Sequence, residues 1–135
     1  MTFQFPIRVY WEDTDAGGIV FYANYLKFFE RARTEWLRSK GLEQRMLKET
    51  TGGMFVVSET RVKYHRPARL DDALLVSVNF AQSGRSSLWV EQQALAVSEK
   101  NTQLVLCEGS IRIGWVDATL MKPARIPEII LKALK

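Results

Sequence analysis

The sequence predicts an α+β fold in which an antiparallel sheet wraps around a single long helix, and three observations support this. One strand-like segment at 3–11 is followed by one apolar-faced helical segment at 22–39. Four more strand-like segments then follow with short connections, at 54–66, 73–82, 86–99 and 103–117. A lone helix with many large apolar side chains needs a sheet to cover it, which favours this architecture.

The whole chain reads as one domain. Its 135 residues match the length of an ordinary domain, and it contains no linker, internal repeat or low-complexity block. The composition, 47% hydrophobic and 25% charged, is typical of a globular protein. No apolar run approaches the length of a membrane span. We therefore expect a single domain over residues 1–135 and no membrane insertion.

The first strand is predicted from the alternating segment FQFPIRVYW. Its large apolar residues fall on one side of an extended chain, namely Phe3, Phe5, Ile7, Val9 and Trp11. This period of two is typical of a strand with one buried face. Proline lacks the backbone N–H that a central strand needs, so Pro6 favours a place at the edge of the sheet.

The long helix is predicted over residues 22–39. Core-directed positions recur there at helical spacing, namely Leu26, Phe29, Ala32 or Arg33, and Trp36. Gly41 follows and is a suitable residue to end the helix. The polar stretch 42–53 shows no clear period and receives no assignment.

The last segments differ in their patterns. In 103–117 apolar residues occupy odd positions, which predicts a strand with one buried face. The segment 86–99 alternates less cleanly, which favours a central strand covered on both faces or partly by another subunit. Pro127 opens EIILKAL, which predicts a short C-terminal helix with proline in its first turn.

Charge and motif content exclude several classes of function. The net charge is +4, and a positive field attracts nucleic acid, membranes and small anions alike. The Lys and Arg residues are scattered and no nucleic-acid-binding signature is present, so we expect no nucleic-acid partner. No Cys/His cluster has metal-ligand spacing, and no P-loop or dinucleotide motif occurs, so we expect neither a metal nor another cofactor.

The N-terminal segment and the single cysteine favour the cytoplasm. Residues 1–8 lack the basic and apolar blocks of a signal peptide. Cys107 has no partner for an internal disulfide and lies far in sequence from His65, the only histidine. We therefore expect a cytoplasmic protein in which Cys107 is a buried small hydrophobe rather than a catalytic thiol.

The acidic segment EDTDAGG, residues 12–18, is the main candidate for a site. Its residues have an ordinary alternative role as solvated or turn-forming groups. A carboxylate just before a helix, however, lies beside unpaired backbone N–H groups, which can bind the oxyanion of an acyl-transfer reaction. No nucleophilic serine motif competes with it, so the sequence favours hydrolysis by a carboxylate.

The segment YWEDTDAGGIVFYANYLKFFERARTEWLR closely resembles the signature of the hotdog-fold acyl-CoA thioesterases of the 4-hydroxybenzoyl-CoA thioesterase class, especially the bacterial Tol-Pal-associated branch. The resemblance continues more loosely through VVSETRVKYHRPARLDD at 56–72 and covers most of the chain. It implies a hotdog fold, in which a five-stranded antiparallel sheet wraps around one central helix. It also implies an enzyme that hydrolyses an acyl-CoA to a free carboxylic acid and CoA.

The resemblance assigns roles to the acidic loop and the helix start. Asp15 matches the catalytic carboxylate, which acts either as nucleophile or as general base on water, and the sequence leaves both routes open. Tyr22 falls where the helix begins, and its backbone N–H would polarise the thioester carbonyl. Gly17, Gly18 and Ile19 would shape the loop around the acyl group. The Tol-Pal-associated branch usually has histidine in place of Tyr22, so its substrate is not carried over.

The turn SGRSS loosely resembles the family's nucleotide-contacting segment, which implies substrate-binding roles for Arg85 and Ser86. Coenzyme A carries a 3′-phosphate and a pyrophosphate, which need cations near the mouth of the pocket. The same cations suit an acidic acyl carrier protein. An alternative is therefore a protein that binds this carrier, or a scaffold of cell-envelope or lipid metabolism, with weak or vestigial hydrolysis.

The expected assembly is also that of the family. A hotdog subunit has an exposed sheet edge and an incomplete pocket, so we expect a homodimer or homotetramer with sites shared between subunits. The sequence leaves open the length and the aromatic or aliphatic character of the acyl group, and the choice of CoA or carrier protein.

Overall fold

A computed structural model describes residues 2–135 and shows a five-stranded antiparallel sheet in the order β1-β3-β4-β5-β2. The elements in chain order are β1 (Phe3–Arg8), the short 3-10 helix η1 (Trp11–Asp13), α1 (Asn24–Ser39), α2 (Gln44–Thr51), β2 (Gly53–Tyr64), β3 (Ala73–Ser83), β4 (Ser87–Val97), β5 (Gln103–Asp117) and α3 (Glu128–Leu134). The predicted fold class is confirmed, with five strands, one long helix and a short C-terminal helix.

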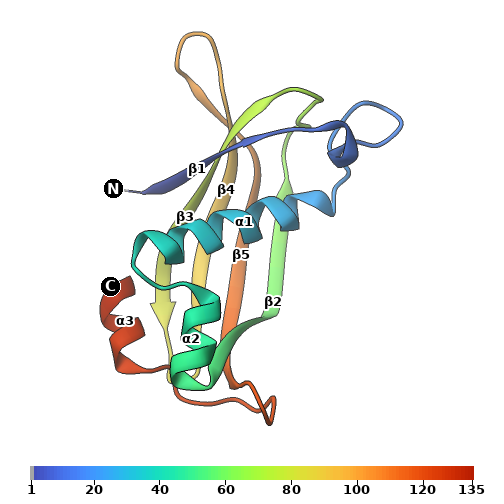
Figure 1. The fold of residues 1–135 in the computed structure, drawn as a ribbon. Coiled ribbons are helices and arrows are strands. Elements are labelled where there is room, and N and C mark those ends of the chain that lie inside the picture. The colour runs from blue at the N-terminus through green and yellow to red at the C-terminus, as the bar shows by residue number, and fades with distance from the viewer. Residues whose placement is uncertain (1) are drawn as a thin grey trace.

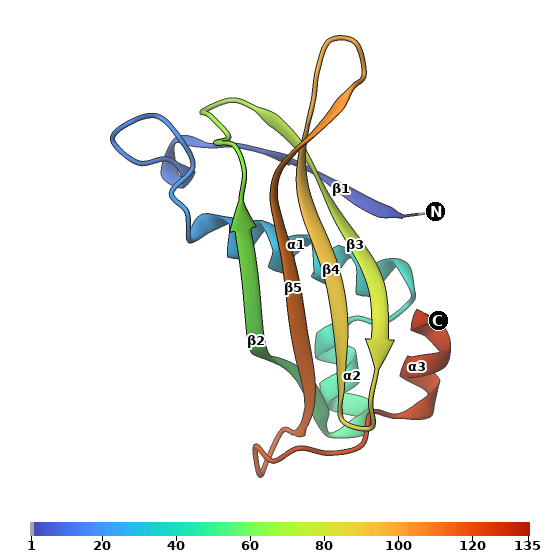
Figure 2. The same ribbon diagram turned by 180° about the vertical axis from the view of Figure 1, so that it is seen from behind.

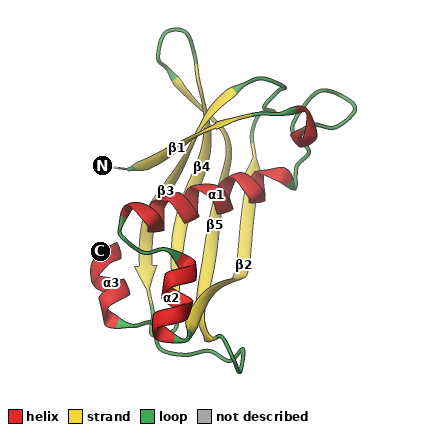
Figure 3. Cartoon of the chain, viewed as in Figure 1, coloured by secondary structure: helices red, strands yellow, loops and turns green. Residues whose placement is uncertain are grey.

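The sheet curves around α1, which crosses its concave face (Figure 1). The same view coloured by secondary structure shows α2 and α3 on that face as well (Figure 3). Seen from behind, the strands lie in front of the helices, and no helix of residues 2–135 covers the opposite face of the sheet (Figure 2). The strand 87–97 is central, as predicted, and β1 with Pro6 forms one edge. The other edge is β2, which has β5 on one side only.

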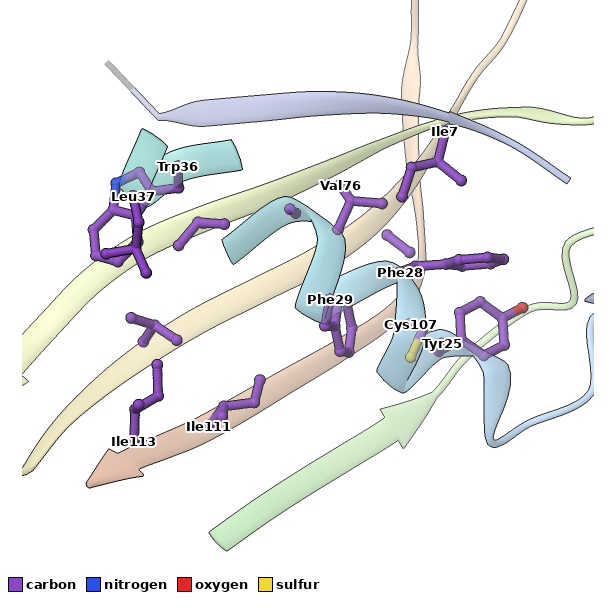
Figure 4. Packing of buried hydrophobic residues seen from close by; sticks show 14 of the residues in the cluster. Ile7, Tyr25, Phe28, Phe29, Trp36, Leu37, Val76, Cys107, Ile111 and Ile113 are labelled. Atoms are coloured by element: carbon purple, nitrogen blue, oxygen red, sulfur yellow. The ribbon is translucent and has the colours of Figure 1, made fainter. Parts of the chain in front are cut away.

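The core lies between α1 and the sheet. Phe28 and Phe29 of α1 are fully buried and face apolar side chains of the strands, such as Ile111 of β5 (Figure 4). The odd-position apolar face of β5 is confirmed, whereas Arg112 between its members is exposed. The apolar side chains of the long helix therefore supply the interior of the domain, because burial of their surface drives the packing.

The first strand is shorter than predicted. It ends at Arg8, and Trp11 belongs to η1 with 84% of its surface exposed. The cause is Asp13, whose carboxylate accepts a hydrogen bond from the Tyr10 backbone N–H at 2.8 Å. The Asp13 N–H in turn donates to the Tyr10 carbonyl at 3.0 Å, which closes a turn and directs Trp11 away from the sheet.

Two further predictions need correction in the helical region. The long helix begins at Asn24, not at Tyr22, and Leu26 on its predicted apolar face is 42% exposed. The unassigned stretch contains α2, which buries only Leu47 and ends at Thr51, followed by Gly52 as its C-cap in the left-handed region with φ 75°. One buried side chain in two turns leaves too little apolar periodicity to detect. No helix within residues 2–135 is long and apolar enough to cross a membrane.

Candidate active site

The acidic loop is a tight hairpin that returns on itself before α1. Thr14 and Val20 form an antiparallel bridge, and the Asp15 N–H donates to the Ile19 carbonyl at 2.8 Å. The Gly18 N–H donates to the Asp15 carbonyl at 3.1 Å. Gly18 has φ 78°, a conformation that residues with a Cβ rarely adopt, so the turn requires glycine there. This turn places Asp15 next to the tip of the loop.

The two aspartates of this loop have different environments. Asp13 is only 4% exposed, and its backbone carbonyl accepts hydrogen bonds from the Phe21 N–H at 3.0 Å and the Asn24 side-chain amide at 2.8 Å. Asp15 is exposed, and its Oδ1 accepts one hydrogen bond, from the Gly17 N–H at 2.8 Å. Asp13 is therefore held as a structural residue, whereas Asp15 keeps carboxylate lone pairs available for another molecule.

The chain between the loop and α1 offers backbone donors. Within residues 2–135, no acceptor pairs with the backbone N–H of Tyr22 or of Ala23, the residue that precedes α1. Such unpaired donors at a helix start carry partial positive charge and suit a carbonyl oxygen or oxyanion. The Tyr22 carbonyl accepts a hydrogen bond from the Tyr64 hydroxyl at 2.9 Å, which connects this turn to the end of β2. Partial burial raises the pKa of Tyr64, so its hydroxyl keeps the proton that it donates.

A second set of contacts holds the loop against the segment after β2. Val20 N–H donates to the Ala68 carbonyl at 2.9 Å, and Leu70 N–H donates to the Gly18 carbonyl at 3.3 Å. The Ala68 N–H donates to the hydroxyl of Tyr25, which is 3% exposed. The same segment, residues 68–70, therefore holds both the acidic loop and the first turn of α1.

A hollow of about 250 Å³ opens beside this helix start. Its lining includes Ile19, Tyr22, Tyr64, His65 and Arg66. The His65 Nε2 lies 3.4 Å from a carboxylate oxygen of Glu108. The hollow therefore combines aromatic walls with the guanidinium of Arg66, as a binding site for a partly apolar anion requires.

The predicted site residues fall into two groups. Gly17, Gly18 and Ile19 lie in the same loop as Asp15, and Tyr22 comes shortly after that loop. Arg85 and Ser86 instead form the turn between β3 and β4, whereas the acidic loop lies beside the start of β3 (Figure 2). The 11 residues of β3 span roughly 35 Å. The structure therefore does not bring this turn to Asp15 within one chain.

The remaining candidates for chemistry are placed elsewhere. Cys107 is fully buried, and burial together with Glu108 raises its pKa to about 12, so its thiol stays protonated at neutral pH. It is a core residue, as predicted. Within residues 2–135, no three His, Cys, Asp or Glu side chains gather closely enough to hold a metal ion. Sequence reasoning assigned no role to Tyr64, because its contact with Tyr22 joins residues 42 positions apart.

Comparison with known proteins identifies clear relatives. The sequence pattern of the thioesterase-like superfamily matches residues 9–134. The chain is 40% identical over 131 residues to the acyl-CoA thioesterase YbgC of Haemophilus influenzae, and this alignment covers 97% of this chain and 93% of the relative. It is 41% identical over 133 residues to the acyl-CoA thioester hydrolase YbgC of Escherichia coli O6:H1, covering 98% and 96% of the two chains.

Solved structures show the same fold. The structure of a probable thioesterase from Bartonella henselae superposes with a TM-score of 0.84 and 30% identity, covering 94% of this chain and all of the other. A 4-hydroxybenzoyl CoA thioesterase in complex with 4-hydroxybenzoyl CoA superposes with a TM-score of 0.92, covering 99% of both chains at 15% identity. At that identity the second likeness concerns the fold alone.

Proposed function

The chain belongs to the thioesterase-like superfamily and is an acyl-CoA thioesterase, and we propose that the loop carrying Asp15 performs the hydrolysis. One observation supports this assignment, namely that an exposed carboxylate with free lone pairs lies in the loop that leads to two unpaired backbone N–H groups at the start of α1. A base or nucleophile and an oxyanion-binding group are the two elements that thioester hydrolysis requires.

In the proposed reaction, the thioester carbonyl oxygen accepts hydrogen bonds from the backbone N–H of Tyr22 and Ala23. In the general-base route, Asp15 takes a proton from water as the water oxygen bonds to the acyl carbon. The carbon–sulfur bond then breaks, CoA leaves as a thiolate that takes up a proton, and the free acid remains. In the nucleophilic route, Asp15 itself displaces CoA to give a mixed anhydride, which water cleaves.

We propose that two chains associate through β2. This strand offers a free edge of 12 residues, and an exposed edge of that length is a template for pairing with another strand. Antiparallel pairing of two β2 strands about a two-fold axis places the Tyr64 end of one strand beside the Gly53 end of the other. The acidic loop of one chain then approaches the end of its partner that carries Arg85 and Ser86, where the CoA phosphates would bind.

We expect the Tyr64→Phe variant to have a kcat about threefold to tenfold lower than the parent, the equivalent of one hydrogen bond of about 1 kcal/mol. Phenylalanine keeps the aromatic ring, whose centroid lies 5.7 Å from that of Tyr25. Only the hydrogen bond from the Tyr64 hydroxyl to the Tyr22 carbonyl is lost. Steady-state kinetics with a thermal unfolding midpoint measures both effects. A change in KM alone would argue that Tyr64 merely lines the pocket.

The test of the function is release of free thiol from a panel of short aliphatic, long aliphatic and aromatic acyl-CoAs. We expect saturable hydrolysis of at least one of them without added metal. The same acyl groups carried on acyl carrier protein serve as the comparison set. If no thioester in either set is hydrolysed, the proposed function is wrong, and binding of the carrier protein without turnover would support a scaffold role instead.

A further inference from the structure

A second cavity, of about 130 Å³, lies beneath α1 toward its C-terminal half and is separate from the hollow at the helix start. Its walls are mostly apolar and come from six elements, with Trp36 and Leu37 of α1, Phe55 and Val57 of β2, and Ile113 of β5 among them and one residue each from α2, β4 and α3. A cavity of about 150 Å³ holds one benzene ring. This space therefore suits an acyl group of about five or six carbons.

Two charged side chains line this cavity, an exposed one, Glu30, and a buried one, Arg33. Arg33 is 9% exposed, and its Nη1 donates to the Gln92 side-chain oxygen at 2.9 Å. Gln92 is fixed in turn, because its amide nitrogen donates to the backbone carbonyls of Phe29 at 3.0 Å and Ser77 at 3.2 Å. Arg33 takes part in no ion pair within residues 2–135.

A guanidinium has five N–H donors, and Gln92 accepts from one of the Arg33 nitrogens. No buried side-chain nitrogen within residues 2–135 lacks a partner, so the other guanidinium nitrogens of Arg33 reach accessible space, where a ligand can meet them. Burial lowers the pKa of Arg33, and the negative charge of Glu30 opposes that shift. Glu30 does not pair with Arg33, because it is exposed and its carboxylate accepts a hydrogen bond from the Thr34 hydroxyl at 3.0 Å. Buried charges in proteins are ordinarily paired, so this cation at the wall of an apolar cavity is suited to an anionic ligand.

We propose that this cavity binds the distal end of the acyl group and that Arg33 pairs there with a carboxylate of the substrate. The preferred substrate is then the CoA monothioester of a short dicarboxylic acid. This inference rests on the proposed function and narrows its substrate class. A carboxylate matches the planar fork of arginine and forms two parallel hydrogen bonds with it.

The position of the cavity implies that a partner chain supplies the catalytic loop. Arg33 lies nine residues beyond the start of α1, about 14 Å along the helix axis. A five-carbon acyl chain is only ~6 Å long at about 1.5 Å per bond. The cavity is, however, lined by the first half of β2, the part that faces the partner's helix start when two β2 edges pair antiparallel.

The first test compares glutaryl-CoA with pentanoyl-CoA, which have the same number of acyl carbons. We expect the parent to prefer glutaryl-CoA by about tenfold or more in kcat/KM, since the energy of a charge-assisted hydrogen bond exceeds 1.4 kcal/mol. Arg33→Met should abolish that preference and Arg33→Lys should retain part of it. Arg112→Met, which removes an exposed cation from the other face of β5, is the matched control and should leave the preference unchanged.

The outcomes separate the two claims. Hydrolysis of pentanoyl-CoA as fast as glutaryl-CoA by the parent overturns the dicarboxylate assignment and leaves the thioesterase assignment standing. If neither thioester is hydrolysed, calorimetric titration with free glutarate and free pentanoate still tests the cavity. Binding of glutarate alone, lost in Arg33→Met but not in Arg112→Met, supports the inference, whereas equal binding of both acids or of neither refutes it.

The second test asks whether one site draws on two chains. Asp15→Asn and Arg33→Met chains are unfolded together and refolded as a mixture. If Asp15 of one chain serves the cavity of the other, random pairing restores about a quarter of all sites to full composition. Recovered glutaryl-CoA hydrolysis near that fraction supports the shared site. Activity no higher than the average of the two separate variants would show that each chain uses its own cavity or that Arg33 has no role.

Discussion

The Asp15→Asn variant is expected to hydrolyse acyl-CoA about a hundred to ten thousand times more slowly than the parent, the range that loss of a general base or of an activated nucleophile produces. The amide has the shape of the carboxylate and its oxygen can still accept the Gly17 N–H, so the loop is retained. It cannot take a proton from water, and it is a poor nucleophile. Single-turnover kinetics with the enzyme in excess measures the chemical step directly.

The neighbouring Asp13→Asn variant is the matched control, because it removes a charge two residues away. The Asp13 carboxylate supports η1, so we expect a lower thermal midpoint and a kcat within about tenfold of the parent's, as for a change outside the reacting atoms. An equal loss of kcat in both variants at full folding would mean that charge in the loop, not Asp15 itself, matters. Mass spectrometry of acid-quenched parent enzyme distinguishes the two routes, since only the nucleophilic route forms an acyl-Asp15 anhydride.

The Phe29→Ala variant is expected to lose about 3–5 kcal/mol of unfolding free energy, as large-to-small substitutions of buried aromatic residues do. Phe29 is fully buried at the centre of α1 (Figure 4). Its ring lies so close to Gly109 that a Cβ placed on that glycine would be 3.0 Å from Cε2 of Phe29. The sheet cannot close over the space without moving β5. Urea unfolding measures the loss, and Tm should fall by roughly 10–20 °C.

Leu26→Ala on the same helix is the comparison. It also removes a large apolar side chain, but from a position that is 42% exposed, so we expect the unfolding free energy to fall by less than about 1 kcal/mol. Similar losses in the two variants would contradict the assignment of Phe29 to the core. Because Leu26 follows the helix start, its acyl-CoA kinetics also report whether that exposed leucine contributes to substrate binding.

The periodic parts of the chain were predictable from the sequence. The alternation in 103–117 gave β5 with the bounds found in the structure, and the helical spacing of Phe29 and Trp36 identified the one long helix and its buried face. These signals are local, because a strand or helix with one buried face repeats its apolar residues at a fixed interval. The acidic segment before that helix also indicated a carboxylate site, and the resemblance to a family implied Asp15 within it.

Sequence reasoning failed where a contact from elsewhere in the chain overrode the local pattern. The alternation continues to Trp11, but the hydrogen bonds of Asp13 close a turn that ends the strand. The helix α2 has one buried side chain, so its position depends on contacts with β2 rather than on its own period. Arg33 occupies a helical core position, and its charge gave no indication that a cavity lies beside it.

The sequence by itself therefore determined the architecture and pointed to the acidic segment 12–18, because both follow from short-range patterns of apolar and acidic residues, whereas the choice of Asp15 within that segment came from the resemblance to a family. Only the tertiary structure distinguished buried Asp13 from exposed Asp15, and only it set Tyr64 against the helix start. It also placed Arg85 and Ser86 at the far end of β3 from Asp15. These features depend on which distant segments the sheet brings together, and no local period records that.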